Sequence, residues 1–217
     1  MNSGVKNFEN QRWSLSDSKG GLKHGAAKKI IDAGSVLDLG CGDGFFLKSL
    51  GPQFNRLKGL DISEEAVKKA RDKDIDAEVF DFANDPLPCE NSSFDTVVML
   101  DILEHLYSPQ NLLKEAKRVA KKSIIISVPN FNSLPARIQT LLGRVPENNT
   151  PSKGHIYWFN ILILKKLIKD SGLKIIALEI NTFGQNRFLI GHLTNYLSRI
   201  WPGSFALSFV IKAQKII

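Results

Sequence analysis

The sequence contains only two cysteines, and none of its apolar runs is long enough to cross a membrane. Cys41 and Cys89 are too few for a disulfide framework, which favours a reducing compartment. A membrane-spanning helix needs about 20 apolar residues, whereas lysines interrupt the longest apolar stretches of this chain within a few residues. The first residues are polar and lack the apolar segment of a signal peptide. We therefore expect a cytoplasmic protein without a transmembrane segment.

Zinc-ligand cysteine patterns and added RNA-binding modules are also missing. The chain does carry 29 basic and 22 acidic residues, a formal net charge of +7. Such an excess can attract nucleic acid, an anionic membrane surface or an acidic substrate. The basic residues are spread along helix-like segments, however, as between Lys114 and Lys122, and this is typical of a solvated face. The charge gives no strong signal for a nucleic-acid partner and says nothing of the oligomeric state.

No linker rich in proline, glycine or serine divides the chain, so we expect one domain over residues 1–217. Short apolar runs alternate with amphipathic segments, a pattern typical of a doubly wound, mostly parallel α/β sheet. The runs expected to form buried strands are residues 36–39, 57–60, 77–80, 96–100 and 124–128. The segments expected to form helices are residues 21–33, 45–50, 64–72 and 109–121, with Ser63 and Ser108 as N-cap residues.

The alternation stops after the fifth predicted strand, where residues 129–157 contain four prolines. A later helix should end at Gly172 in a left-handed conformation. The remaining expected elements are a short amphipathic piece at 136–142, helices over 159–171 and 188–200, and strands over 173–180 and 205–213. We assign residues 1–20 to an N-terminal extension, and residues 129–160 and 182–203 to insertions that shape a substrate pocket or lid.

A glycine turn follows the first predicted strand. Gly40, Gly42 and Gly44 permit a tight turn that brings backbone N–H groups close to a ligand, just before a helix begins near Phe45. Asp38 stands inside the otherwise apolar strand, where an unpaired carboxylate is costly. We therefore expect Asp38 to have a partner, and the ammonium group of a ligand would serve.

Two further strands end in acidic residues at the same edge of the predicted sheet. Asp61 ends the second strand, 21 residues after Gly40, where a carboxylate can accept hydrogen bonds from both hydroxyls of a ribose. Ile62 could then cover one face of an adenine. Asp81 could accept a hydrogen bond from the adenine amino group while Phe82 packs on the ring edge. One such Asp is as often a cap or loop residue, but three beside a glycine turn indicate a ligand site.

Together these segments resemble the motifs of class I S-adenosylmethionine-dependent methyltransferases. Residues 36–44 resemble the first motif, residues 59–63 the second, and residues 94–98 with 103–106 the region of the fourth strand. Residues 127–131 with 137–139 are similar to the methionine biosynthesis protein W group within methyltransferase type 11. The resemblance covers about residues 20–180.

The resemblance implies a seven-stranded Rossmann-like sheet in the order 3-2-1-4-5-7-6 with strand seven antiparallel. It also implies S-adenosyl-L-methionine as the cofactor and a small-molecule methyl acceptor. The residues it assigns to the cofactor are Asp38, Gly40, Cys41, Gly42, Gly44, Asp61, Ile62, Asp81, Phe82 and Leu100.

His105 is the candidate catalytic residue. A methyl group on a sulfonium is already activated, so a base is needed only when the acceptor must lose a proton. His105 follows the fourth strand and should face the cofactor crevice, while His155 and Tyr157 could close over the substrate. Alternatively, Glu104 and His105 orient the loop, and the later residues pack a lid against the sheet.

A metal site is a second reading of the same segment. Asp101, Glu104 and His105 fall at i, i+3 and i+4, so they share one face of a helical turn, and His155 could add a fourth ligand. Similar sets in methyltransferases carry a longer Glu where this chain has Asp101. We therefore predict no metal.

Three other functions remain as alternatives. The net charge would suit an RNA or protein methyltransferase, although the sequence lacks the Asn-Pro-Pro-aromatic turn of amino-directed DNA and protein-glutamine methyltransferases and has Met99 to Ile102 in its place. A nicotinamide dehydrogenase would normally show G-x-G-x-x-G, whereas the third glycine here comes one residue early. A non-catalytic S-adenosylmethionine-binding module would bind the cofactor without turnover.

Overall fold

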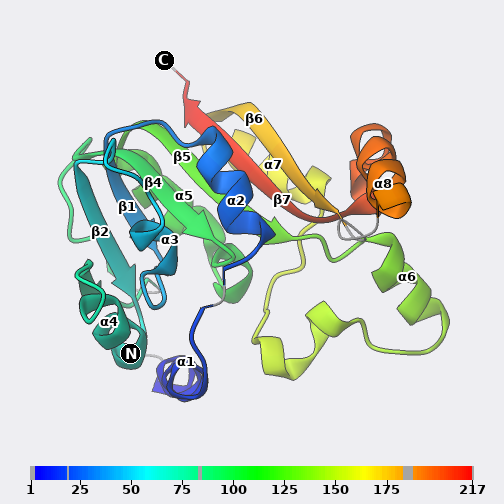
Figure 1. Cartoon of the computed structure of the whole chain (residues 1–217), viewed down its shortest axis with the longest axis horizontal. Helices are drawn as coiled ribbons and strands as arrows, with labels where there is room; N and C mark the ends of the chain where they lie inside the picture. The colour runs from blue at the N-terminus through cyan, green and yellow to red at the C-terminus, as the bar shows by residue number, and fades with distance from the viewer. Residues whose placement is uncertain (1–2, 19, 83–84, 183–187, 217) are drawn as a thin grey trace.

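The computed structural model describes residues 3–18, 20–82, 85–182 and 188–216, and its strands form one seven-stranded mixed sheet (Figure 1). The strands are β1 (Ser35–Leu39), β2 (Arg56–Asp61), β3 (Asp76–Val79), β4 (Phe94–Leu100), β5 (Ala120–Pro129), β6 (Leu173–Thr182) and β7 (Ala206–Lys215). Their order is β3-β2-β1-β4-β5-β7-β6. The first five strands pair in parallel, whereas β7 is antiparallel to both β5 and β6. The fold implied by the resemblance is confirmed.

Helices cover both faces of this sheet. The helices of the described residues are α1 (Ser3–Leu15), α2 (Leu22–Ile30), α3 (Phe45–Lys48), α4 (Glu64–Arg71), α5 (Pro109–Val119), α6 (Leu134–Leu141), α7 (Ile161–Asp170), α8 (Phe188–Ile200) and α9 (Pro202–Phe205), with 3-10 helices η1 (Leu103–His105), η2 (Glu147–Asn149) and η3 (Pro151–Lys153). One hydrophobic core joins α5 and α7 to the sheet, and a second joins α2, α3 and α4 to the opposite face.

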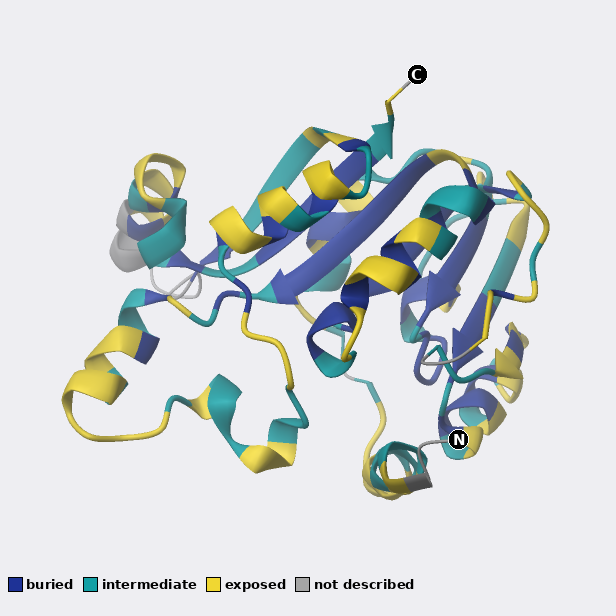
Figure 2. Ribbon diagram, turned by 180° about the vertical axis from the view of Figure 1, so that it is seen from behind, coloured by how far each residue is buried: buried dark blue, intermediate teal, exposed yellow. Residues whose placement is uncertain are grey.

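The two cores explain why the strands are apolar on both sides. In β1, Leu37 and Leu39 belong to the core under α5 and α7, while Val36 belongs to the core under α2, α3 and α4. Side chains of a strand alternate between faces, so Asp38 projects from the Val36 face of the sheet. Figure 2 shows the buried residues concentrated in the strands and the exposed ones on the outer sides of the helices. Asp38 is thus a carboxyl group placed within a hydrophobic layer.

Local signals in the sequence were mostly accurate at the helix ends. The Ser63 hydroxyl accepts a hydrogen bond from the Ala66 N–H at 3.1 Å, as expected of an N-cap. Gly172 follows the C-cap residue of α7 and has a φ of +70°, the left-handed conformation that was predicted. Ser108 is the N-cap residue of α5, as predicted, but its side chain makes no capping hydrogen bond to any residue that the structure describes. Pro109 occupies the first helical position, where its missing N–H is one of those that a helix leaves unpaired.

Helix α1 and the stretch from α6 to η3 extend beyond the sheet and the helices packed on its two faces (Figure 1). Helix α1 falls within the predicted N-terminal extension, lies beyond the carboxyl ends of the parallel strands and packs beside α4 (Figure 1). The stretch from α6 to η3 projects from the sheet and is largely exposed (Figures 1 and 2). Of the insertion expected over residues 182–203, residues 183–187 lie outside the described part, and residues 188–200 form α8 as predicted. Among the described residues, no helix is long and apolar enough to span a bilayer.

Candidate cofactor and catalytic site

Two adjoining clefts open at the carboxyl ends of β1, β2 and β4, with volumes of about 390 and 240 Å³. The larger cleft is bordered by residues that follow β2 and β3 and extends to His105. The smaller cleft contains Asp38 and the glycine turn. The residues that border both are Arg12, Trp13, Lys23, Gly40 and Leu100. The two clefts therefore form one continuous groove with Gly40 and Leu100 at its junction.

The glycine turn connects β1 to α3 through three left-handed residues. Gly40, Gly42 and Gly44 have φ values of +75°, +54° and +72°, which non-glycine residues adopt only with strain. The N–H groups of Gly40 and Cys41 donate to the Leu60 carbonyl at 2.7 and 3.1 Å. These bonds fasten the turn to the end of β2, and so they hold the glycine backbone against the groove.

Asp38 is buried beside this turn, with 2% of its surface exposed. Burial, together with the neighbouring charge of Asp61, raises the pKa of Asp38 to about 8. No described residue donates a hydrogen bond to its Oδ1 atom. A buried carboxyl oxygen without a donor is costly, and Asp38 borders the smaller cleft. The predicted need for a partner is therefore visible in the structure.

Asp61 forms a clamp between the second strand and the turn. Its Oδ2 accepts the Gly42 N–H at 2.8 Å, and its Oδ1 accepts the Ser63 N–H at 2.9 Å. Burial raises the pKa of Asp61 to about 6, although these two backbone bonds act in the opposite direction. Each carboxylate oxygen has a second lone pair, and the side chain borders the larger cleft. Asp61 can therefore accept ligand hydroxyls while it also shapes the turn, a second role that the sequence did not indicate.

The residues after β3 border the larger cleft as predicted. β3 ends at Val79, so Asp81 and Phe82 lie beyond the strand rather than at its last position. The Phe82 ring meets the Phe80 ring edge-on, with centroids 5.7 Å apart. Ile62 and Leu100 also border this cleft. Of the ten predicted cofactor residues, Gly44 alone borders neither cleft among the described residues, because it is the N-cap residue of α3 and lies against Ala70.

Helix α1 supplies a wall of the groove that the sequence analysis missed. Glu9, Arg12 and Trp13 border the larger cleft, and Arg12 and Trp13 also border the smaller one. Burial raises the pKa of Glu9, although Arg12 beside it acts in the opposite direction. Phe8, one turn before Arg12, lies 3.3 Å from where a Cβ atom on Gly154 would stand. A tryptophan in a polar segment was the one available signal, since large aromatic side chains usually pack against something.

Polar contacts hold α1 on α4. The Lys6 ammonium lies 2.6 Å from the Glu64 carboxylate, and the Ser63 hydroxyl donates to the Asn10 side chain at 2.8 Å. The Lys69 ammonium donates to the Trp13 carbonyl at 2.7 Å. These bonds place the Trp13 indole over the glycine turn.

Asp101 does not join the ligand set that the sequence suggested. Its φ is +58°, and its carboxylate accepts from Lys23 at 2.8 Å and from the Ser127 hydroxyl. Burial raises the pKa of Asp101, but the Lys23 ammonium and the Ser127 hydrogen bond outweigh it and lower the pKa overall. Asp101 therefore does not join the four-ligand set that was the second reading of this segment, because Lys23 already neutralises its carboxylate.

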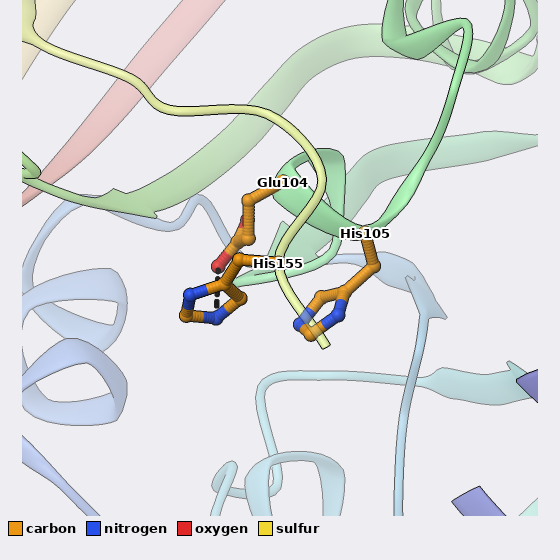
Figure 3. Close-up of side chains that lie close together, drawn as sticks. All are labelled: Glu104, His105 and His155. Carbon is orange, nitrogen blue, oxygen red and sulfur yellow. Dashed lines mark ion pairs between the residues drawn. The ribbon is translucent and has the colours of Figure 1, made fainter. Parts of the chain in front are cut away.

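Glu104, His105 and His155 do come together, with the three side chains pointing toward one another (Figure 3). The imidazole centroids are 4.8 Å apart. Burial, with His155 beside it, lowers the pKa of His105 to about 4, and burial lowers the pKa of His155. His105 is therefore neutral throughout the neutral pH range. Tyr157 is exposed, and its ring stacks on Phe159 with centroids 6.0 Å apart.

Comparison with known proteins gives a consistent family. A family model described as a methyltransferase domain matches residues 18–178. An uncharacterized protein of Methanocaldococcus jannaschii is 31% identical over 154 residues, 69% of each chain. A probable S-adenosylmethionine-dependent methyltransferase of Mycobacterium tuberculosis is 29% identical over 147 residues, which are 67% of this chain but 51% of the relative. The chain thus spans about half the length of the mycobacterial relative. A ubiquinone biosynthesis O-methyltransferase of Thiobacillus denitrificans is 32% identical over 106 residues, 45% of each chain.

Solved structures share the fold along the whole chain. A Thermotoga maritima protein described as a possible histamine N-methyltransferase superposes with a TM-score of 0.67 at 19% identity, covering 99% of this chain and 95% of that one. Magnesium protoporphyrin IX methyltransferase from Synechocystis, solved with S-adenosylhomocysteine bound, has the same TM-score at 18% identity and full coverage of both chains. At these identities the likeness shows the fold alone.

Proposed function

Because this chain belongs to the S-adenosylmethionine-dependent methyltransferase family, we propose that it transfers the methyl group of that cofactor to a small organic molecule. The observation that carries the proposal is the continuous groove at the strand ends, of which α1 forms one wall. Its larger cleft, about 390 Å³, is within the range of small-molecule sites. A groove walled in by α1 is better suited to a small acceptor than to a folded macromolecule.

The groove suggests how the cofactor is oriented. The adenosine would occupy the larger cleft, with its ribose hydroxyls on Asp61 and its base between Ile62, Asp81 and Phe82. The amino-acid end would occupy the smaller cleft, where its ammonium group meets the unsatisfied oxygen of Asp38. The sulfonium would then lie near Leu100, which borders both clefts.

The acceptor would enter beside His105, which borders the larger cleft at its other end. A neutral imidazole can accept a proton from the acceptor as the methyl group is transferred. The low pKa of His105 makes it a weak base, so alignment of acceptor and methyl group would provide the larger part of the rate enhancement. Phe131 and His155, from the insertion at residues 129–160, would border the acceptor beyond His105, because both rings pack there.

The cofactor assignment is tested by calorimetry with the purified chain. S-adenosylmethionine and its demethylated product should bind, and a nicotinamide dinucleotide should not. Binding of the dinucleotide without the sulfonium would contradict the assignment.

The acceptor class is tested with cofactor labelled in the methyl group. Label should enter the small-molecule fraction of a cell extract. Label found only in RNA or protein would favour the alternative suggested by the net charge of +7. Cofactor binding with no transfer to any fraction would instead identify a non-catalytic binding module.

A further inference from the structure

We propose that Glu104, His105 and His155 bind a divalent transition-metal ion at the acceptor end of the groove. The metal site itself does not depend on the proposed function. Only the role of the ion rests on that function, because the ion would contact the methyl acceptor at this end of the groove. It departs from the expectation of no metal, which depended on Asp101. The structure instead gives a set of two imidazoles and one carboxylate, a combination that suits zinc and related first-row metals better than magnesium.

Glu104 is the first argument for a ligand. Its side chain is fully buried, and no described residue donates a hydrogen bond to either carboxylate oxygen. Buried carboxylates are almost always paired, hydrogen-bonded or bound to a metal. The His155 Nε2 atom lies 4.0 Å from Glu104 Oε1, which is too far for a hydrogen bond. The gap between the two atoms is therefore wide enough to be bridged by a third group.

The protonation of the two imidazoles is the second argument. His155 Nδ1 lies 2.7 Å from the Asn148 carbonyl, and His105 Nδ1 lies 3.1 Å from the Gly154 carbonyl. A carbonyl oxygen only accepts, so each Nδ1 must carry the proton and each neutral ring keeps a lone pair on Nε2. Metal-bound histidines are held in the same way, with the second ring nitrogen donating to a carbonyl or carboxylate.

The backbone holds the three residues in place. Glu104 and His105 are adjacent in η1, and the N–H groups of Ile156 and Tyr157 donate to the Glu104 carbonyl at 2.7 and 2.9 Å. These bonds bring His155 across from η1. One ligand atom from each residue lies within 4.8 Å of the others. Ligands of a tetrahedral zinc ion lie roughly 3.4 Å apart, so the side chains need to close by about 1 Å.

An ion with three protein ligands keeps a position open for substrate. His105 borders the larger cleft, so that position would face the acceptor. A metal-bound acceptor hydroxyl loses its proton to solvent more readily. Its oxygen would then bond to the methyl carbon while the carbon–sulfur bond breaks, and the electron pair of that bond would pass to sulfur and leave a neutral thioether. The ion would thus activate the acceptor, and in the metal-bound enzyme His105 would be a ligand and not the base, because its Nε2 lone pair would be held by the ion.

The experiment measures metal binding directly. The chain is freed of metal with a chelator and titrated with Zn²⁺, Mn²⁺ or Mg²⁺ by calorimetry, and the metal content is measured after gel filtration. We expect one Zn²⁺ per chain, with weaker Mn²⁺ binding and no measurable Mg²⁺ binding. Glu104→Gln and His155→Ala should each lower the Zn²⁺ affinity at least 100-fold, whereas His192→Ala, an exposed histidine on α8, should not. Co²⁺ should show the visible absorption bands of a protein site in the unsubstituted chain and not in the Glu104→Gln variant.

Two results would overturn the proposal. One is the absence of stoichiometric Zn²⁺ or Co²⁺ binding in the unsubstituted chain. The other is equal binding by the unsubstituted chain and a Glu104→Gln variant whose circular dichroism shows that it is folded. S-adenosylmethionine binding is measured on the same metal-free samples. Cofactor binding without metal binding would reject the metal site alone, and metal binding without cofactor binding would reject the proposed function alone.

Discussion

The indole of Trp13 lies so close to Gly42 that a Cβ atom on Gly42 would come within 2.5 Å of the ring. Trp13 belongs to α1, and Gly42 is the middle glycine of the turn after β1. The contact explains how α1 forms a wall of the groove. It also makes the absence of a side chain at residue 42 a condition for closing that wall.

Gly42→Ala should weaken S-adenosylmethionine binding and lower the free energy of unfolding by about 1–3 kcal/mol, because the new methyl group meets Trp13 and the φ of +54° is strained for alanine. Adding Trp13→Ala should relieve the clash and leave the backbone strain. Urea unfolding and calorimetry measure both effects. Gly25→Ala is the control, because beyond its chain neighbours and the backbone of its own helix no described atom lies within 4 Å of the added group. Similar behaviour of the two glycine variants would contradict the prediction.

Trp13→Ala alone should raise the dissociation rate of the demethylated cofactor roughly tenfold or more, because the removed ring borders both clefts. Stopped-flow displacement measures this rate. Leu15→Ala changes the same helix at a side chain that is 80% exposed, and it should leave the rate unchanged. Equal rates in both variants would show that α1 does not retain the cofactor.

Asp61→Ala should weaken cofactor binding by about 2–4 kcal/mol, because two ribose hydroxyls lose a charged acceptor and the Gly42 N–H loses its partner. Asp81→Ala should cost about 1–2 kcal/mol, since an adenine amino group can turn to water. Asp61→Asn, which keeps one acceptor oxygen, should fall between Asp61→Ala and the unsubstituted chain. Negligible losses in all three variants would assign these acids to loop structure only.

Cofactor binding at pH 7 should release close to one proton, and Asp38 should be its source. With a pKa of about 8, Asp38 is mostly protonated at pH 7 without ligand. A ligand ammonium favours the ionised form and lowers this pKa, so binding expels the proton. The release should shrink as the pH rises above 8, where the carboxyl is already ionised. Calorimetry of metal-free protein in buffers of different ionisation enthalpy measures the release, and Asp38→Asn should abolish it. Equal release by both proteins would reject this role.

His105→Ala should lower turnover by about 10²–10⁴-fold while the dissociation constant of the cofactor changes little, because His105 borders the acceptor end of the groove. Lys166→Ala, at a side chain of α7 that is 77% exposed and borders neither cleft, is the control and should leave turnover unchanged. A fully active His105→Ala variant would contradict the roles of His105 both as base and as metal ligand. The enzyme would then work by alignment of its substrates alone.

The strands and the glycine turn could be predicted because their signals are local. Buried strands read as short apolar runs, and the left-handed residues of the turn are all glycine. Helix α1 could not be predicted in this way, since its contacts with α4 are polar, as between Lys6 and Glu64, and leave no apolar period in the sequence. The lowered pKa of His105 was also out of reach, because it depends on burial and on His155, 50 residues away in the chain.

For the acidic residues too, the sequence predicted the local pattern, whereas the contacts depend on the folded chain. Asp61 was recognised from its spacing to Gly40, but its bonds to Gly42 and Ser63 depend on the folded turn. Asp101 was grouped with Glu104 by helical spacing, whereas its left-handed backbone directs its carboxylate to Lys23.

Helix α1 contacts both ends of the groove, with Trp13 on the glycine turn and Phe8 against Gly154, next to His155. A shift of α1 on cofactor entry would therefore also displace the loop beside the acceptor. Donor and acceptor binding would then be coupled through one helix, and each ligand would change the affinity for the other by the same factor.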